Sequence, residues 1–245
     1  MIRKQIASAS AQRWMHFAFL LLISAIGVLR FVHLSADFPN DTPWMIDQAK
    51  FTDEGWWSSG AVMHMLTGHW YRSGDYNPAV ALPVWPLLLS AVFQFTGVSV
   101  VAARALNVSI SLASMGLVYL LVRRFTRPGA HVPAFAAVIL LVLSPFAFVF
   151  CRLAILDSLV AFESCLCLLV ASFAAPRRIW PLAVLPVLVS VMLFTKTTSA
   201  ALIPAVLWLA WSTLGRKPSA FLRAALAIAV APAVIVEGYA ALAAA

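Results

Sequence analysis

The sequence is poor in charged residues. Only 11% of its 245 residues are Asp, Glu, Lys or Arg, whereas soluble domains carry about 25%. Hydrophobic residues make up 63% of the chain, and the mean hydropathy is +0.94. This composition excludes a soluble globular domain and places the chain among polytopic membrane proteins that have the lipid bilayer as a partner.

Cysteine and long basic runs are also scarce. The three cysteines lie in or beside apolar segments, and Cys165 and Cys167 point to different sides of a helix, so neither a disulfide nor a cysteine metal pair is expected. The net charge of +8 comes from short basic clusters between apolar runs. They lack the aromatic interleaving of a nucleic-acid surface, so we expect no nucleic-acid partner. They match the cytoplasmic anchors of the positive-inside rule.

Acidic residues are few and unevenly placed. Asp157 begins an apolar run, and six of the nine acids lie in one polar stretch after the first apolar run: Asp37, Asp41, Asp47, Asp53, Glu54 and Asp75. All nine can lie on one side of a membrane if the short run at 83–97, which opens with two prolines, does not cross it. The basic clusters around Arg123, Arg177 and Arg216 then fall on the other side.

This charge pattern predicts an all-α polytopic fold in which residues 1–245 form a single transmembrane module. The amino terminus is inside, and the seven expected spans are about 16–34, 100–122, 132–150, 154–174, 180–195, 198–214 and 219–241. The first outer loop, about 35–99, should hold two interfacial helices at about 53–70 and 82–96. Trp56, Met63, Leu66 and Trp70 give the first of these helices one apolar stripe. Because the Ala-rich end stops at the outer end of the seventh span, we expect a truncated form of a longer protein.

The pair Asp53-Glu54 has two interpretations. A carboxylate held at the membrane surface by a helix can be catalytic. Alternatively, Thr52 or Asp53 caps the helix and Glu54 in the first turn favours the helix dipole. The two interpretations are compatible.

Asp157 and several cations at outer span ends form a second group. Placing an acidic side chain beside an apolar span is costly, so Asp157 is by default interpreted as a functional-site residue. The alternative interpretation is that Asp157 forms an interfacial ion pair with Arg152. Outer-end cations oppose the positive-inside trend. They either extend to bulk lipid phosphates or bind one phosphate of a lipid-linked donor. These cations are Arg30, Arg104, Arg152 and Lys196.

Three motifs together resemble a known family. Thr52-Asp53-Glu54-Gly55, Gly68-His69-Trp70 and Asn77-Pro78 resemble the first outer loop of integral-membrane GT-C glycosyltransferases, most closely the protein O-mannosyltransferase and lipid A aminoarabinose transferase group. The segment from Arg152 to Asp157 resembles the second acidic motif of that group, and the segment from Leu193 to Thr198 a later one. The resemblance covers nearly the whole chain, with the motifs in the family's order.

The resemblance implies an inverting glycosyltransferase that moves a sugar from a polyprenyl-phosphate carrier to a lipid, glycan or protein acceptor. Asp53 matches the catalytic acid, Glu54 its neighbour and Asp157 the second-loop acid. Arg152 and Lys196 are expected to hold the carrier phosphate, with Arg104 and Arg30 as the next candidates. The resemblance assigns no definite cofactor, and a divalent metal with Asp157 as ligand is left open. The expected location is a bacterial inner membrane, with the site facing the periplasm.

The sequence departs from the family pattern in the first outer loop. Trp56 stands where the aminoarabinose transferases carry Arg, and Asn77-Pro78-Ala79 stands where they carry Lys-Pro-Pro. Together with His69, Trp56 and Asn77 are therefore expected to serve the acceptor or the loop rather than the phosphate.

Two other classes stay open. A catalytically inactive GT-C-like membrane subunit would keep the module and lose transfer. A transporter would place charged residues near mid-bilayer in several spans or show repeated broken helices. In this sequence only Glu163 is a charged residue expected near mid-bilayer, and no internal repeat is seen.

Overall fold

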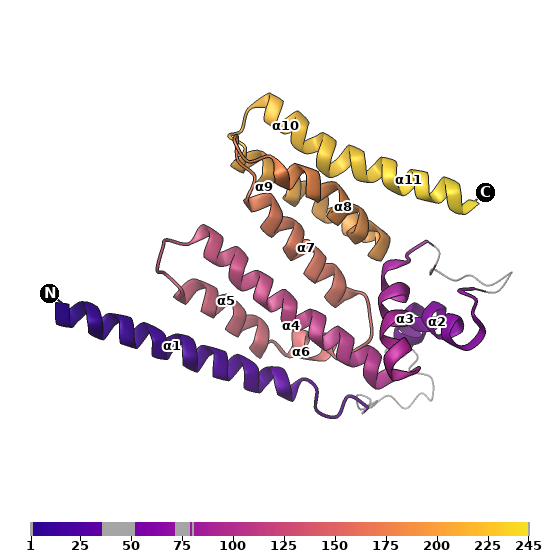
Figure 1. Cartoon of the computed structure of the whole chain (residues 1–245), viewed down its shortest axis with the longest axis horizontal. Coiled ribbons are helices and arrows are strands. Elements are labelled where there is room, and N and C mark those ends of the chain that lie inside the picture. Colours follow the sequence, from indigo (N-terminus) through magenta and orange to yellow (C-terminus); the bar gives the residue numbers. More distant parts are fainter. Residues whose placement is uncertain (1, 36–51, 72–78, 80, 245) are drawn as a thin grey trace.

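The computed structural model describes residues 2–35, 52–71, 79 and 81–244, and this part of the chain is helical without a β-strand. The long helices run side by side as a bundle, with α1 (Ile2–Leu29) and α11 (Ala231–Ala244) at opposite edges (Figure 1). Between them lie α4 (Val100–Phe125), α5 (Val132–Leu143), α7 (Asp157–Ser172), α8 (Trp180–Thr195) and α9 (Ile203–Thr213). The all-α prediction is confirmed.

Within the residues that the structure describes, two helices are long and apolar enough to cross a membrane. They are α4 and the continuous helix Pro218–Ala241, which joins α10 (Pro218–Ala225), η2 (Leu226–Val230) and most of α11. The pair formed by α5 and α6 (Pro145–Cys151) would make a third span but is bent by 66°. Shorter apolar helices include Trp14–Leu29 and Trp180–Thr195. The count of seven spans stays a prediction.

The bend between α5 and α6 has a local cause. The sequence predicts one span over 132–150, but Pro145 has no backbone N–H to continue the helix. Ser144 takes an extended conformation, and its hydroxyl accepts a hydrogen bond from the amide of Ala147 at 3.2 Å, which starts a new helix. The run is therefore two helices rather than one.

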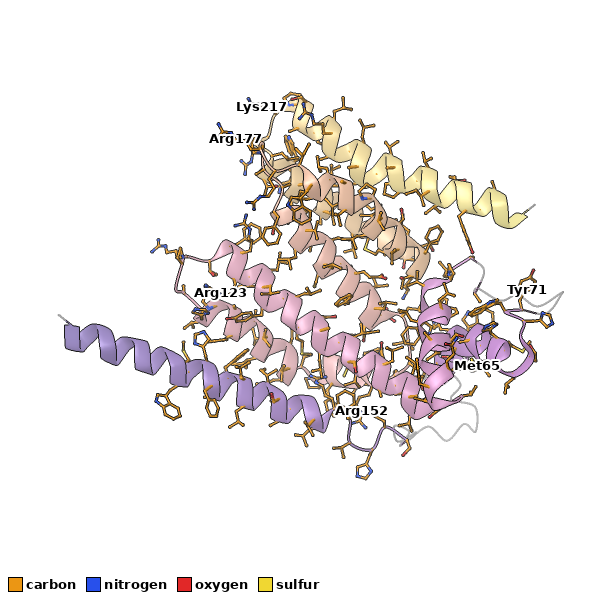
Figure 2. All side chains as sticks on the ribbon, viewed as in Figure 1. Met65, Tyr71, Arg123, Arg152, Arg177 and Lys217 are labelled. Carbon is orange, nitrogen blue, oxygen red and sulfur yellow. The ribbon has the colours of Figure 1, made fainter. Side chains whose placement is uncertain are left out.

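The short basic clusters of the loops gather at one end of the bundle. Arg123, Arg177 and Lys217 lie at one end, whereas Arg152 lies at the other, together with Met65 and Tyr71 of the α2 region (Figure 2). We call the second end the Arg152 end. The sequence predicts this separation from loop charges alone.

Helices α2 (Thr52–Thr67) and α3 (Val84–Thr96) pack together at the Arg152 end (Figure 1). Ala61 of α2 and Trp85, Leu89 and Phe93 of α3 are buried in one apolar cluster with Leu156. This cluster fixes the two helices to α4 and to the start of α7. The predicted helices at 53–70 and 82–96 are thus present, and their position in a membrane interface stays a prediction.

The predicted apolar stripe on α2 does not form this packed face. Trp56 is 42% exposed and Leu66 71% exposed. The α2 residues in or against the cluster are Trp57, Ala61 and Met65, spaced four apart along the helix, together with Val62.

Candidate functional site

Glu54 and Arg104 form the central contact of the Arg152 end. Nε of Arg104 donates to Oε1 of Glu54 at 2.9 Å, and Nη2 donates to Oε2 at 2.7 Å. Both residues are buried, with 8% of Glu54 and 4% of Arg104 exposed. This two-fold geometry is the strongest form of a carboxylate–guanidinium pair.

The pair connects four parts of the chain. Oε1 of Glu54 also accepts from the amide of Ala154 at 2.6 Å, and Nη1 of Arg104 donates to the carbonyl of Leu34 at 2.8 Å. The first turn of α2 is therefore tied to α4, to the segment after α1 and to the segment before α7.

Asp53 differs from its neighbour. Its side chain is exposed and makes no hydrogen bond or ion pair with another described residue. It lies in the first turn of α2, where a carboxylate favours the helix dipole. Of the two adjacent acids, Glu54 holds the structure together, and Asp53 stays accessible to a ligand.

The segment between α6 and α7 carries the second motif. Its inner residues, Leu153 to Leu156, are all buried. Nδ2 of Asn107 on α4 donates to the carbonyl of Leu153 and, at 3.1 Å, to the hydroxyl of Ser158. The segment is fixed from two sides, by Asn107 and by Glu54. Its two ends, Arg152 and Asp157, are the parts that reach the surface.

Asp157 pairs with Lys196 at the end of α8. Nζ of Lys196 lies 2.9 Å from Oδ1 of Asp157, and 58% of the Asp157 side chain is exposed. The alternative indicated by the sequence, an ion pair between Asp157 and Arg152, is wrong for this structure. The ion pair with Arg152 was predicted because the two residues are close in sequence. In the structure, the end of α8 lies near the start of α7, and Asp157 therefore pairs with Lys196.

Arg152 lies against the segment that follows α1. Its Nη2 donates to the carbonyl of His33 at 3.0 Å, and its guanidinium lies 5.2 Å from the ring centre of Phe148. Among the described residues this carbonyl is the single hydrogen-bond acceptor of the Arg152 guanidinium. The side chain is only half-buried, so the N–H groups of the guanidinium that do not bond to His33 can reach a ligand.

Arg30 is fully buried and donates hydrogen bonds to both helices at the break between α5 and α6. It donates to the carbonyls of Val142 and Ala147, at 2.9 and 3.2 Å, and to Sγ of Cys151 at 2.9 Å. These carbonyls belong to the two helices that Pro145 separates. The geometry gives Arg30 and Arg104 internal partners, which argues against the expectation that they are the next phosphate ligands after Arg152 and Lys196.

A cavity of about 530 Å³ lies beside the Glu54–Arg104 pair. Its wall includes Gly55 and Ser58 of α2, Phe93 of α3 and Ser99 at the start of α4. The wall is mostly apolar, with hydroxyls and the buried ion pair as its polar groups. Such a cavity suits a molecule with apolar surface and a few polar groups.

The remaining predicted residues are less informative. Trp56 and His69 are exposed, and Asn77 lies outside the described residues. The part of the chain that the structure describes holds no group of three His, Cys, Asp or Glu side chains that could bind a metal. Asp157, the candidate ligand, instead faces the Lys196 ammonium.

The sequence analysis did not identify Asn107 as part of the site. A signal was present: Arg104, Asn107 and Ser111 recur at intervals of three and four, which places them on one helix face. All three are buried in the structure. A polar stripe within an apolar helix is a sign of an internal polar network.

Comparison with known proteins places part of the chain in a family. The family model described as dolichyl-phosphate-mannose-protein mannosyltransferase matches residues 78–236, more than half of the chain. The matched part includes Arg152, Asp157 and Lys196 and begins after Asp53 and Glu54. No curated protein and no solved structure matched the chain.

Proposed function

Because the chain belongs to the dolichyl-phosphate-mannose-protein mannosyltransferase family, we propose that it transfers a sugar from a polyprenyl-phosphate carrier to an acceptor at the outer face of a membrane. The family implies glycosyl transfer from a lipid-linked donor in general. The side of the membrane, the inverting mechanism and the residues that act are the finer parts of the proposal.

The observation that carries the proposal is the contrast between Glu54 and Asp53. Glu54 is fixed by Arg104 and by the amide of Ala154, so the first turn of α2 has a defined position. Asp53 is exposed in that same turn. An exposed carboxylate on a rigid support can meet an acceptor hydroxyl group in a fixed geometry.

Asp53 is the general base in this proposal. As the acceptor oxygen attacks the anomeric carbon of the sugar, its proton passes to the Asp53 carboxylate. The bond between the anomeric carbon and the phosphate oxygen breaks on the opposite side, which inverts the configuration. The leaving group is the polyprenyl phosphate.

Lys196 and Arg152 stabilise the leaving phosphate. The negative charge that develops on that phosphate is lowered in energy by cations already in position. Lys196 is 32% exposed at its side chain and is oriented by Asp157, while Arg152 is oriented by the His33 carbonyl. Both belong to the Arg152 end, where a lipid phosphate can sit while its tail remains among apolar helices.

The proposal is tested by transfer from a defined polyprenyl-phosphate sugar, with purified wild-type protein compared with Asp53→Asn. Glu237→Gln is the matched control, because Glu237 is an exposed carboxylate on α11 outside the proposed site. We expect transfer by the wild type and by Glu237→Gln, and strong loss in Asp53→Asn. A wild-type protein that binds the donor and transfers nothing would support a catalytically inactive subunit instead.

A further inference from the structure

Glu163 is a buried acid that the proposed mechanism does not use. It lies on α7 and is 6% exposed. The hydroxyl of Thr195 on α8 lies 2.7 Å from its Oε1 and 3.0 Å from the carbonyl oxygen of Val191 one turn earlier, so its single hydrogen is shared between these two acceptors. Thr195 is fully buried. An acidic side chain among apolar helices is costly and is retained where it has a specific partner or task.

Thr195 is the last residue of α8, and Lys196 follows it directly. Pro186 lies inside α8 and removes one backbone hydrogen bond, so the second half of the helix is less firmly held by the first half. Beyond Thr195, the amide of Lys196 and the hydroxyl of Ser199 both donate to the carbonyl of Met192, at 3.1 and 3.0 Å. The end of α8 and the segment after it thus form one locally ordered unit.

Two side chains of α7 meet this unit at adjacent residues. Asp157 pairs with Lys196, and Glu163 bonds to Thr195. Asp157 and Glu163 are six residues apart, which is about 9 Å along a helix. One contact is exposed and polar, and the other is buried between the helices. The buried contact fixes where the Lys196 backbone lies relative to Asp157.

We propose that Glu163 is a positioning residue: through the Thr195 hydroxyl it holds the end of α8 so that the Lys196 ammonium faces the carrier phosphate. This inference rests on the proposed function, because it concerns the cation assigned to that phosphate. Glu163 acts through a hydrogen bond and not through its charge, so an amide at position 163 can replace the acid.

The experiment measures binding of a short-chain polyprenyl phosphate to purified variants, expressed per folded protein. Thr195→Val removes the hydroxyl at nearly constant shape, and Glu163→Leu removes its acceptor. Each should weaken binding by about three- to tenfold, the scale of one hydrogen bond between membrane helices. Thr195→Ser and Glu163→Gln keep a hydrogen-bonding group and should bind almost as the wild type does.

Ser164→Ala is the matched control. Ser164 lies beside Glu163 on α7, and its hydroxyl contacts Sδ of Met192 on α8 at 3.6 Å. Among the described residues its hydroxyl makes no hydrogen bond to Thr195 or Lys196, so its loss should leave carrier binding unchanged. A general loosening of the two helices would weaken binding in Ser164→Ala as well and would overturn the specific role of Glu163.

A combined variant separates positioning from stability. In a Lys196→Ala background, Thr195→Val should weaken carrier binding no further, because the cation that it positions is absent. If Lys196→Ala alone binds the carrier like the wild type, the proposed phosphate site is wrong. If Lys196→Ala weakens binding and Thr195→Val does not, the phosphate site stands and the role of Glu163 is wrong.

Discussion

The guanidinium of Arg104 donates two parallel hydrogen bonds to the carboxylate of Glu54, from α4 to the first turn of α2. Both groups are buried, and each has a further backbone partner. The pair thereby separates the roles of two adjacent acids. Glu54 fixes the helix, and its neighbour Asp53 is left exposed.

Glu54→Ala should destabilise the protein by about 3–5 kcal/mol, because it leaves Arg104 as a buried charge without its carboxylate. Unfolding in detergent, followed by helical circular dichroism, measures the effect. The double variant Glu54→Leu with Arg104→Met should lose less stability than the sum of the two single changes. If the losses simply add, the pair is not the structural contact described here.

Asp53→Asn should fold as the wild type does. The Asp53 side chain makes no hydrogen bond with another described residue, so the change removes only a favourable charge at the helix start, which is worth about 0.3–1 kcal/mol. If Asp53 is the base, transfer should fall by about 10²–10⁴-fold. Turnover from a polyprenyl-phosphate sugar and unfolding in detergent are measured on the same sample. Full turnover in this variant would reduce Asp53 to a residue that favours the helix dipole.

Arg152→Ala and Lys196→Ala should each weaken binding of a polyprenyl phosphate by about 10-fold or more, since each loses a charge-assisted contact. Arg152→Lys should recover little, because an ammonium lacks the planar fork that reaches both the His33 carbonyl and a phosphate. Arg177→Ala is the control, an exposed arginine at the opposite end of the bundle. Equal losses in all three alanine variants would indicate attraction to bulk lipid rather than a site.

Labelling with an impermeant thiol reagent in intact cells tests the sidedness. His69→Cys and Ser219→Cys change exposed positions, and loop charge predicts that the first faces outside and the second faces the cytoplasm. Only His69→Cys should react before the cells are opened. The unchanged protein is the background, because two of its three cysteines are buried and the third is half-buried. Reaction of Ser219→Cys alone would invert the predicted topology.

The sequence by itself determined the class and the gross arrangement of charge. Low charge and high hydropathy exclude a soluble fold. The short basic clusters between apolar runs predict that these clusters lie together at one end of the bundle. The helix at 82–96 was also predictable, because its two prolines lie at its start, where a missing N–H costs little. These features depend on composition and local spacing alone.

Only the tertiary structure decided which charges meet. Arg30, Arg104, Arg152 and Lys196 were similar outer-end cations in the sequence, yet two are buried among internal partners and two reach the surface. Asp157 pairs with Lys196, 39 residues away, rather than with Arg152, five residues before it. Helical spacing shows which face a residue shares within its own helix. The packing of α4, α7 and α8 against one another sets its partner, because an ion pair between helices depends on where the other helix ends.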